Sequence, residues 1–325
     1  MSKEVFQLII AKKEFPLFYF GRFFYKNDNT LDARNYMSLK EFYSIIFSSK
    51  LERKHTQNIL KNKLNFALFC QENKLETPNL LCYNLYNSFI LDGKQQTVNN
   101  VAQFIELCNS LFKLHHNIEK VFVKACESKG GKDIFLITKN SINATCEIIW
   151  DDIKNASFIF QEGIDQHEKV SQIFPNSINT VRIETYIDKT NTIQILGGYM
   201  RFGSGDSYVD NVDAGGFFVP IYFDKGKLHD KGFTAMINGS KLIDKHPTSH
   251  VKISGFEIPF FSEALVLCKK FASHIPNRLI GWDVAITPNG PMIIEGNYNA
   301  ALIAGEYSYG GFKNHPAFKE ILEEI

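Results

Sequence analysis

Three oxygen-bearing side chains near the end of the chain have the types and spacing of metal ligands. Asp283 lies in an apolar run, and Glu295 and Asn297 lie in a second run after a Thr-Pro-Asn-Gly turn at 287–290. Such a turn between apolar runs predicts a β-hairpin, and side chains two apart on a strand share one face. Two carboxylates and an amide suit Mg²⁺, which binds carboxylate, water and phosphate oxygens. The hairpin therefore predicts a magnesium site for nucleotide phosphates, with ordinary edge carboxylates as the alternative.

A lysine and a glycine-containing loop are suited to holding phosphates. Lys124 closes a short apolar run, and the loop candidates that follow are Ser128, Gly130, Gly131 and Lys132. Glycines let backbone amides approach phosphate oxygens closely. An exposed hairpin is the alternative for Lys-Gly-Gly-Lys, and the GxxxxGK[ST] spacing of a P-loop is absent.

The segment 158–164 runs from an apolar strand into a polar linker, where an adenine ring is well placed. Apolar walls would hold the faces of the ring, and backbone groups would bond its edge. The predicted edge contacts are Gln161, Glu162, Gly163 and Ile164. Glu168, just beyond, is placed to hold ribose hydroxyls. A plain connecting loop is the alternative.

Two arginines at matched positions on consecutive predicted strands are suited to a developing negative charge. Arg182 lies in the predicted strand 180–187 and Arg201 ends the predicted strand 192–201. Guanidinium groups bind phosphate and carboxylate in a bidentate way. Asn211 opens a polar loop before a Gly-Gly pair, which is expected to bring backbone close to a ligand. Surface ion pairs and a tight bend are the alternative.

The elements that position these residues follow from hydrophobic periodicity and turn signals. Helices are expected within residues 1–60, with a capping box at Ser38 and Glu41. Further helices are expected at 54–73, 99–113 and 262–274, and the strands at 80–83, 121–124, 134–138, 158–161, 180–187, 192–201, 216–223 and 282–287. A helical start is thus followed by a small α/β part and a strand-rich region.

Charge and composition narrow the function classes. The chain has 325 residues, with 36 Lys plus Arg against 35 Asp plus Glu and a net charge of +1, so no nucleic-acid partner is expected. The six scattered cysteines are expected to be small buried hydrophobic residues. Isolated cysteines of this kind favour a reduced, cytoplasmic setting. No run approaches the roughly 20 apolar residues of a membrane span.

The aromatic and basic segment 15–26 has two interpretations. It is expected to pack on the core as a helix. The alternative is a surface that rests on a membrane or a glycosyltransferase, which would make the protein membrane-peripheral. The start of the chain does not read as a signal peptide, because Lys12, Lys13 and Glu14 interrupt the apolar stretch.

The order of these motifs resembles the ATP-grasp enzymes over roughly residues 121–300. The run 177–182 (Ser-Ile-Asn-Thr-Val-Arg), together with Asp210-Asn211 and Trp282-Asp283, is similar to the sugar-transfer-associated branch of surface polysaccharide biosynthesis. The resemblance implies an α+β fold in which two subdomains grip ATP. We expect a helical and small α/β region at 1–120, a small subdomain at 121–165 and a large subdomain at 166–325. Many amino-acid ligases of this fold carry Arg before the Gly-Gly pair, where this chain has Ala214.

The resemblance implies an enzyme that joins a small-molecule carboxylate to an amine, with ATP and Mg²⁺ as cofactors. Asp283, Glu295 and Asn297 would hold the metal, and Arg182 and Arg201 would steady the transferred phosphoryl group and the tetrahedral oxyanion. An acyl phosphate would form and be captured by the amine. The alternatives are a kinase on the same fold and a nucleotide-binding partner of a glycosyltransferase.

Two substitutions follow from this hypothesis. Asp283→Asn and Glu295→Gln are both expected to abolish turnover while leaving the stability of the fold near that of the wild type.

Overall fold

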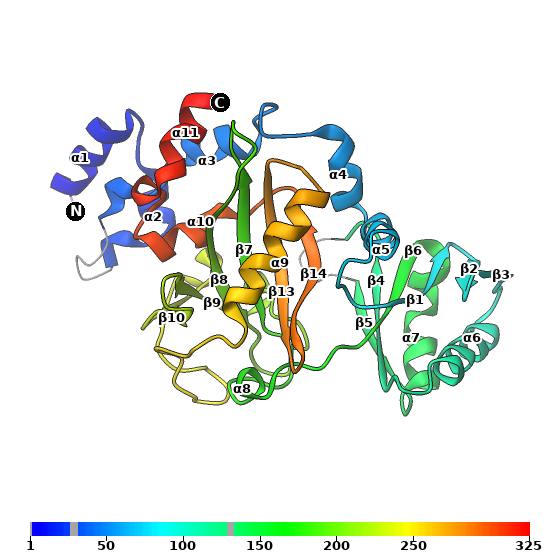
Figure 1. The fold of residues 1–325 in the computed structure, drawn as a ribbon. Coiled ribbons are helices and arrows are strands. Elements are labelled where there is room, and N and C mark those ends of the chain that lie inside the picture. Colours follow the sequence, from blue (N-terminus) through cyan, green and yellow to red (C-terminus); the bar gives the residue numbers. More distant parts are fainter. Residues whose placement is uncertain (1, 27–31, 129–132) are drawn as a thin grey trace. The chain divides into compact units, whose positions relative to one another are not determined.

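The computed structural model describes residues 2–26, 32–128 and 133–325, and the chain divides into two compact units (Figure 1). Unit 1 comprises Met1–Gln57 and Gln166–Ile325, and unit 2 comprises Asn58–Asp165. Each unit is built on its own antiparallel sheet, so each is described by itself.

Unit 2 contains a six-stranded sheet in the order β3-β2-β1-β6-β4-β5. Its strands are β1 (Leu80–Leu85), β2 (Ser88–Leu91), β3 (Lys94–Thr97), β4 (Lys120–Ala125), β5 (Ile134–Thr138) and β6 (Ser157–Glu162). Helices α6 (Val101–Leu114) and α7 (Ile142–Asn155) lie together on one face (Figure 1), where Phe104, Ile149 and Phe160 share one buried core. Leu64 of α5 (Lys63–Glu72) packs with Ile159 of β6 in a separate buried cluster.

The predicted helix 54–73 is two helices, which corrects the sequence interpretation. α4 (Lys54–Lys61) ends before Asn62, and α5 begins after it. The side chain of Asn62 accepts hydrogen bonds from the amides of Leu64 and Asn65, at 3.0 and 3.1 Å. An N-cap satisfies donors that a continuous helix would bond to carbonyl groups, so the chain starts a new helix here.

Unit 1 contains an eight-stranded sheet in the order β12-β11-β9-β8-β7-β13-β14, with β10 beside β9. Its strands are β7 (Thr180–Ile187), β8 (Ile193–Phe202), β9 (Phe217–Tyr222), β10 (Lys227–Leu228), β11 (Gly232–Thr234), β12 (Leu242–Ile243), β13 (Leu279–Thr287) and β14 (Gly290–Asn297). Helix α9 (Phe261–His274) packs against the sheet (Figure 1), and Phe271 meets Trp282 edge to face with ring centroids 5.7 Å apart.

The hairpin predicted from the Thr-Pro-Asn-Gly turn is confirmed. β13 and β14 pair antiparallel, and Thr287 lies opposite Gly290 at the turn. Further along, Asp283 lies opposite Glu295 and Gly281 lies opposite Asn297. Directly opposed residues of an antiparallel pair share one face, so the hairpin carries its polar side chains together.

Short helices surround the sheet of unit 1, and the capping box of Ser38 and Glu41 is confirmed at the start of α3. These helices are α1 (Ser2–Lys12), α2 (Leu17–Gly21), η1 (Phe24–Lys26), η2 (Ala33–Asn35), α3 (Leu39–Ile46), α8 (Glu168–Ser171), η3 (Val212–Ala214), η4 (Met236–Asn238), α10 (Leu302–Gly305), η5 (Glu306–Tyr309), η6 (Phe312–Asn314) and α11 (Pro316–Glu324). A buried ion pair joins Arg22, just after α2, to Glu306 of η5, whose carboxylate also accepts from the amide of Met37 at 2.8 Å.

The aromatic segment 15–26 is divided between core and surface. Phe18, Tyr19 and Phe24 are buried in one apolar cluster, whereas Phe15 and Leu17 are each 58% exposed. Among the described residues, no helix combines the length and apolar character needed to cross a membrane.

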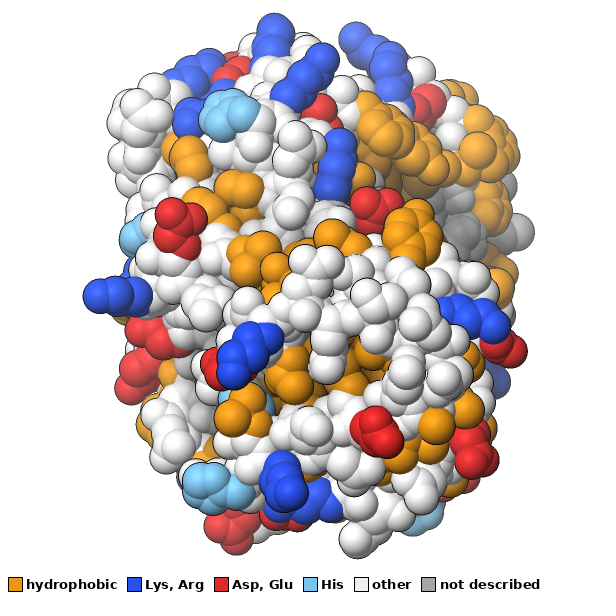
Figure 2. All heavy atoms as spheres, turned by 90° about the vertical axis from the view of Figure 1, so that its right-hand side faces the viewer, with side chains coloured by type: hydrophobic (Ala, Val, Ile, Leu, Met, Phe, Trp, Pro, Cys, Tyr) orange, Lys and Arg blue, Asp and Glu red, His pale blue; other side chains and the backbone are white. Residues whose placement is uncertain are grey.

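On the face shown in Figure 2, Lys and Arg side chains are interspersed with Asp and Glu among uncharged ones.

Candidate active site

A buried cluster of opposite charges lies on one face of β7, β8 and β13. Arg182 lies directly opposite Asp283 in the sheet, and its Nε donates to Oδ1 of that carboxylate. Arg201 places Nη2 3.1 Å from Oδ2 of Asp283. Arg182 and Asp283 are only 6% and 5% exposed. Both oxygens of Asp283 are therefore held by guanidinium groups, and the two arginines meet at one carboxylate.

The cluster keeps Asp283 ionised. Burial by itself would raise the pKa of this carboxyl, but the charges and hydrogen bonds of Arg182 and Arg201 outweigh burial and lower it. Burial likewise opposes the charged form of Arg201, and the carboxylates of Asp210 and Asp283 overcome it, so its pKa is raised. Opposite charges at close range favour both charged forms. The site therefore holds fixed charges before any ligand arrives.

Two residues to which the sequence analysis gave no role in the site, Thr180 and Asp210, hold Arg201 in place. The hydroxyl of Thr180 accepts from Nε and Nη2 of Arg201 at 3.0 and 2.6 Å. It donates in turn to Oδ2 of Asp210 at 2.5 Å, and that carboxylate lies 3.3 Å from Nε of Arg201. Thr180 precedes Arg182 by two positions on the same strand. This spacing places both side chains on one face of the sheet, and it is the sequence pattern from which a role for Thr180 in the site could have been predicted.

The three predicted metal ligands lie together on this face. Glu295 is opposite Asp283 and is half-buried. The amide nitrogen of Asn297 lies 3.5 Å from Oδ2 of Asp283 and 3.4 Å from the carbonyl oxygen of Gly281. No cluster of three or more His, Cys, Asp or Glu suited to a metal occurs in the described part of the chain. A metal held here by Asp283 and Glu295 would complete its coordination with Asn297, waters or phosphate oxygens.

Gly281 makes room for the arginine of the neighbouring strand. A Cβ atom at this position would lie 3.2 Å from both Cδ and Nη1 of Arg182. Contacts this short force a neighbour to move, and here the neighbour is anchored by its bond to Asp283. A glycine on β13 therefore lets the guanidinium of β7 lie flat across the sheet.

The structure places Asn211 and Glu168 at short helices of unit 1. Asn211 caps η3, accepting from the amide of Asp213 at 3.0 Å, and it directly follows the Asp210 that holds Arg201. Glu168 lies in the first turn of α8 with an exposed side chain. The predicted roles of both residues toward ATP stay predictions.

Unit 2 brings two of the predicted phosphate and adenine residues together. Nζ of Lys124 donates to Oε1 of Gln161 at 2.9 Å, and the amide of Gln161 donates to the carbonyl oxygen of Pro78 at 3.3 Å. The carbonyl oxygen of Ser128 accepts from Nζ of Lys63 at 2.6 Å. The predicted loop residues Gly130, Gly131 and Lys132 lie outside the described residues.

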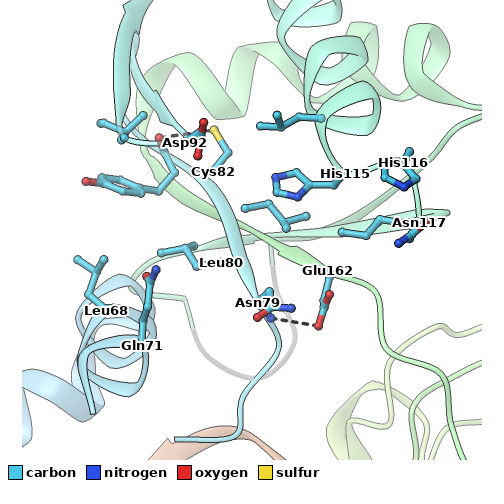
Figure 3. Close-up of a pocket in the computed structure, with 16 residues that line it drawn as sticks. Leu68, Gln71, Asn79, Leu80, Cys82, Asp92, His115, His116, Asn117 and Glu162 are labelled. Atoms are coloured by element: carbon cyan, nitrogen blue, oxygen red, sulfur yellow. Dashed lines mark hydrogen bonds between the residues drawn. The ribbon is translucent and has the colours of Figure 1, made fainter. Parts of the chain in front are cut away.

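The predicted adenine-binding segment borders an open cavity of about 710 Å³ in unit 2. Figure 3 shows Glu162 beside Asn79, with His115 and Asn117 nearby. The amide of Glu162 donates to the carbonyl oxygen of Asn79 at 3.0 Å, and the amide of Gly163 donates to that of Lys120 at 2.8 Å. Both amides are thus used within unit 2, and an adenine edge would need other groups of the segment.

A larger residue in place of Gly163 would force the side chain of Lys120 to move. A Cβ atom there would lie 2.1 Å from Cγ of Lys120, whose Nζ is fixed by Asp165 at 2.9 Å. Ile164 is buried just beyond this crossing. The end of β6 is therefore closely covered by the side chain of a neighbouring strand.

The sequence matches a family described as sugar-transfer associated ATP-grasp over residues 43–311. The chain therefore belongs to the sugar-transfer associated ATP-grasp family. No curated protein matches its sequence. The antiparallel sheets and the helical N-terminal region are those of this α+β fold, as the resemblance implied.

Several solved structures are similar in fold to this member of the ATP-grasp family. One is an N5-carboxyaminoimidazole ribonucleotide synthetase, purK, in complex with ADP, at 10% identity and a TM-score of 0.44, covering 76% of this chain and 46% of that one. Another is a D-alanyl-alanine synthetase A from Vibrio cholerae, at 12% identity and 0.46, covering 81% and 63%. A third is the D-cycloserine synthetase DcsG, at 8% and 0.49, covering 83% and 73%. The chain thus spans less than two thirds of the length of the first two.

The residues of this ATP-grasp enzyme fit the cofactors that its family implies. Asp283 and Glu295 offer carboxylate oxygens on one face, and Asn297 offers a neutral amide, which is a donor set suited to Mg²⁺. Both oxygens of Asp283 are held by arginines in the structure. A metal at Asp283 would share this carboxylate with two guanidinium groups, and phosphate oxygens are natural further partners for both.

Proposed function

We propose that this ATP-grasp enzyme is an ATP- and Mg²⁺-dependent ligase that joins a carboxylate to an amine through an acyl phosphate. The substrate class we favour is a sugar acid or amino acid used in surface polysaccharide biosynthesis, in keeping with the family description. The observation that carries the proposal is the contact of two arginines with Asp283, directly opposite Glu295 on the same face.

The chemistry calls for groups that hold anions and groups that hold a divalent cation. Magnesium bound by Asp283, Glu295 and Asn297 would neutralise phosphate charge as the γ-phosphoryl group is transferred. Lys124 in unit 2 is assigned to the ATP phosphates as a compact point charge. No covalent enzyme intermediate is needed.

Arg182 and Arg201 are assigned to the transferred phosphoryl group and then to the oxyanion formed when the amine attacks. Guanidinium groups form bidentate hydrogen bonds to such oxygens. Their positions are fixed in advance by Asp283, Thr180 and Asp210. Preorganised donors stabilise a developing charge without reorganising during the reaction. The carboxylate is thus activated at a place where the chain has already oriented its cations.

ADP release with a panel of uronic acids and amino acids, each with and without added amines, tests the proposal. The expected result is ATP turnover that requires Mg²⁺, one carboxylate and one amine, with an amide as product. A stable phosphorylated product formed without an amine would instead identify a kinase. No turnover with any carboxylate, together with no Mg²⁺-dependent ATP binding, would refute the proposal.

A further inference from the structure

Glu184 is a buried carboxyl group to which the proposed reaction gives no role. It lies on β7 two residues after Arg182, and its exposed fraction is 0%. Within the described residues, neither of its carboxylate oxygens has a hydrogen-bond partner. Burying a carboxyl group without partners is costly, and native proteins leave few such groups. A residue that costs stability at this place points to a ligand.

Glycines lie opposite Glu184 on both neighbouring strands. Glu184 lies opposite Gly197 on β8 and opposite Gly281 on β13. Directly opposed residues share a face. The side chain of Arg182 fills the space over Gly281, so the row of side chains has a gap only on the side of Gly197. Arg182 lies two residues before Glu184 on β7, which is about 7 Å away at the usual rise of a strand. Arg182 and its opposed residue Asp283 form the next pair of side chains on the same face of the sheet.

Main chain rather than side chain covers this gap. A Cβ atom on Gly305 would lie 2.0 Å from Oε2 of Glu184. A Cβ atom on Gly197 would lie 3.0 Å from the carbonyl oxygen of Gly305 and 3.2 Å from the same Oε2. Gly305 ends α10, a helix of four residues that starts without a side-chain cap. Glu184 is thus covered by a short segment that follows β14, the strand of Glu295 and Asn297.

The protonation state of Glu184 depends on whether a cation lies beside it. Burial raises the pKa of this carboxyl group to about 8, with Arg182 lowering it and Glu306 raising it further. Tyr199 and Tyr309 are the other titratable groups that feel its charge. At neutral pH the carboxyl group is therefore largely uncharged, and a positively charged donor beside it would restore the ionised form.

We propose that Glu184 binds the amino group of the acceptor substrate, an inference that rests on the proposed ligase function. A primary ammonium group offers three N–H donors to a carboxylate that has none. On the side of Gly197, the place now covered by Gly305 would hold a small amine once α10 moves off Glu184. This position lies next to Arg182, which the proposed function assigns to the acyl phosphate. The ammonium group would pass one proton to the Glu184 carboxylate, and the neutral amine would then attack the acyl carbon beside it, forming the C–N bond as phosphate leaves.

Separate measurements of the two half-reactions test the inference with Glu184→Gln. Carboxylate-dependent exchange of oxygen isotopes within ATP reports acyl phosphate formation and needs no amine. The expected result is exchange within about twofold of the wild type. The KM of the amine should rise about 10- to 100-fold, the loss expected for one charged hydrogen-bonded contact. Methylammonium should inhibit the wild type competitively against the amine and should not inhibit the variant.

A matched control is Glu306→Gln, since Glu306 is equally buried but is paired with Arg22. This control should lose stability and keep the amine KM, whereas Glu184→Gln should unfold at an equal or higher urea concentration than the wild type. Should Glu184→Gln not fold, Glu184→Asp keeps the charge and should raise the amine KM by a smaller factor.

Three outcomes decide between the hypotheses. An unchanged amine KM in Glu184→Gln would overturn the inference. Equal loss of both half-reactions in a folded Glu184→Gln would also overturn it, because the residue would then serve the site as a whole. A wild type that shows no isotope exchange with any carboxylate would refute the proposed ligase function itself.

Discussion

Asp283→Asn is expected to cost stability as well as activity, whereas Glu295→Gln is expected to cost activity alone. The sequence alone treated the two carboxylates as equivalent metal ligands on a hairpin. In the structure, Asp283 is the shared counter-charge of two buried arginines. Glu295, on the neighbouring strand, is only half-buried. Their substitutions therefore remove different things.

The size of the effect follows from the burial of the pair. Arg182 and Asp283 are 6% and 5% exposed, and removing one partner of a buried ion pair costs about 3–5 kcal/mol. Arg201 keeps Asp210 at 3.3 Å, so the loss falls mainly on Arg182. We therefore expect about 3 kcal/mol for Asp283→Asn, which is more than a hundredfold in the folding equilibrium. For Glu295→Gln we expect under about 1 kcal/mol.

Urea unfolding followed by tryptophan fluorescence measures this difference. The chain has two tryptophans, so in a Trp150→Phe background the signal comes from Trp282, which is 0% exposed and adjoins Asp283. The expected result is a lower urea midpoint for Asp283→Asn and a nearly unchanged midpoint for Glu295→Gln. Equal midpoints for both variants and the wild type would refute the role of Asp283 as a buried counter-charge.

Three further outcomes follow from the same structure. Arg22→Ala should destabilise unit 1 by about 3–5 kcal/mol, because it leaves Glu306 buried without its cation; urea unfolding checks this, and a Glu306→Gln second substitution should recover part of the loss. Thr180→Val should lower kcat with little change in the KM of ATP, because it removes the hydroxyl that holds Arg201. Thr180→Ser keeps this hydroxyl and should keep kcat near that of the wild type. A normal kcat in Thr180→Val would contradict the prediction. Burial lowers the pKa of His229 to about 4. Between about pH 6.5 and 4 the unfolded chain therefore binds a proton that the folded chain does not, so the free energy of unfolding should fall as the pH falls through this window. His229→Phe should flatten this dependence of stability on pH, and an unaltered dependence would contradict the prediction.

Local patterns predicted most of the strands because each strand carries its own signal. The strand 180–187 was predicted at its observed bounds, and the hairpin followed from its turn. All six cysteines are buried and free, as their isolated positions suggested. These features depend on residues close together in the chain.

Helix α7 was missed although its signal is present. Ile142, Cys146, Ile149 and Ile153 are buried at helical spacing, but the polar residues between them masked the pattern. The network around Arg201 was missed for a different reason. Asp210 reaches Thr180 across 30 positions of sequence from the loop between β8 and η3, and no local pattern links the two residues. Likewise, the orphaned carboxyl group of Glu184 depends on Gly305, which no local pattern links to it.

Binding of Mn²⁺, followed by electron paramagnetic resonance, tests the metal site most directly. Mn²⁺ takes the place of Mg²⁺ at oxygen ligands. Because Arg182 and Arg201 hold Asp283 in the structure, we predict that Mn²⁺ alone binds weakly and that ATP makes its binding tight. Glu295→Gln should abolish the ATP-dependent binding while the protein stays folded. Tight Mn²⁺ binding without ATP, or unchanged Mn²⁺–ATP binding in Glu295→Gln, would contradict the assignment of Asp283, Glu295 and Asn297 as the metal ligands.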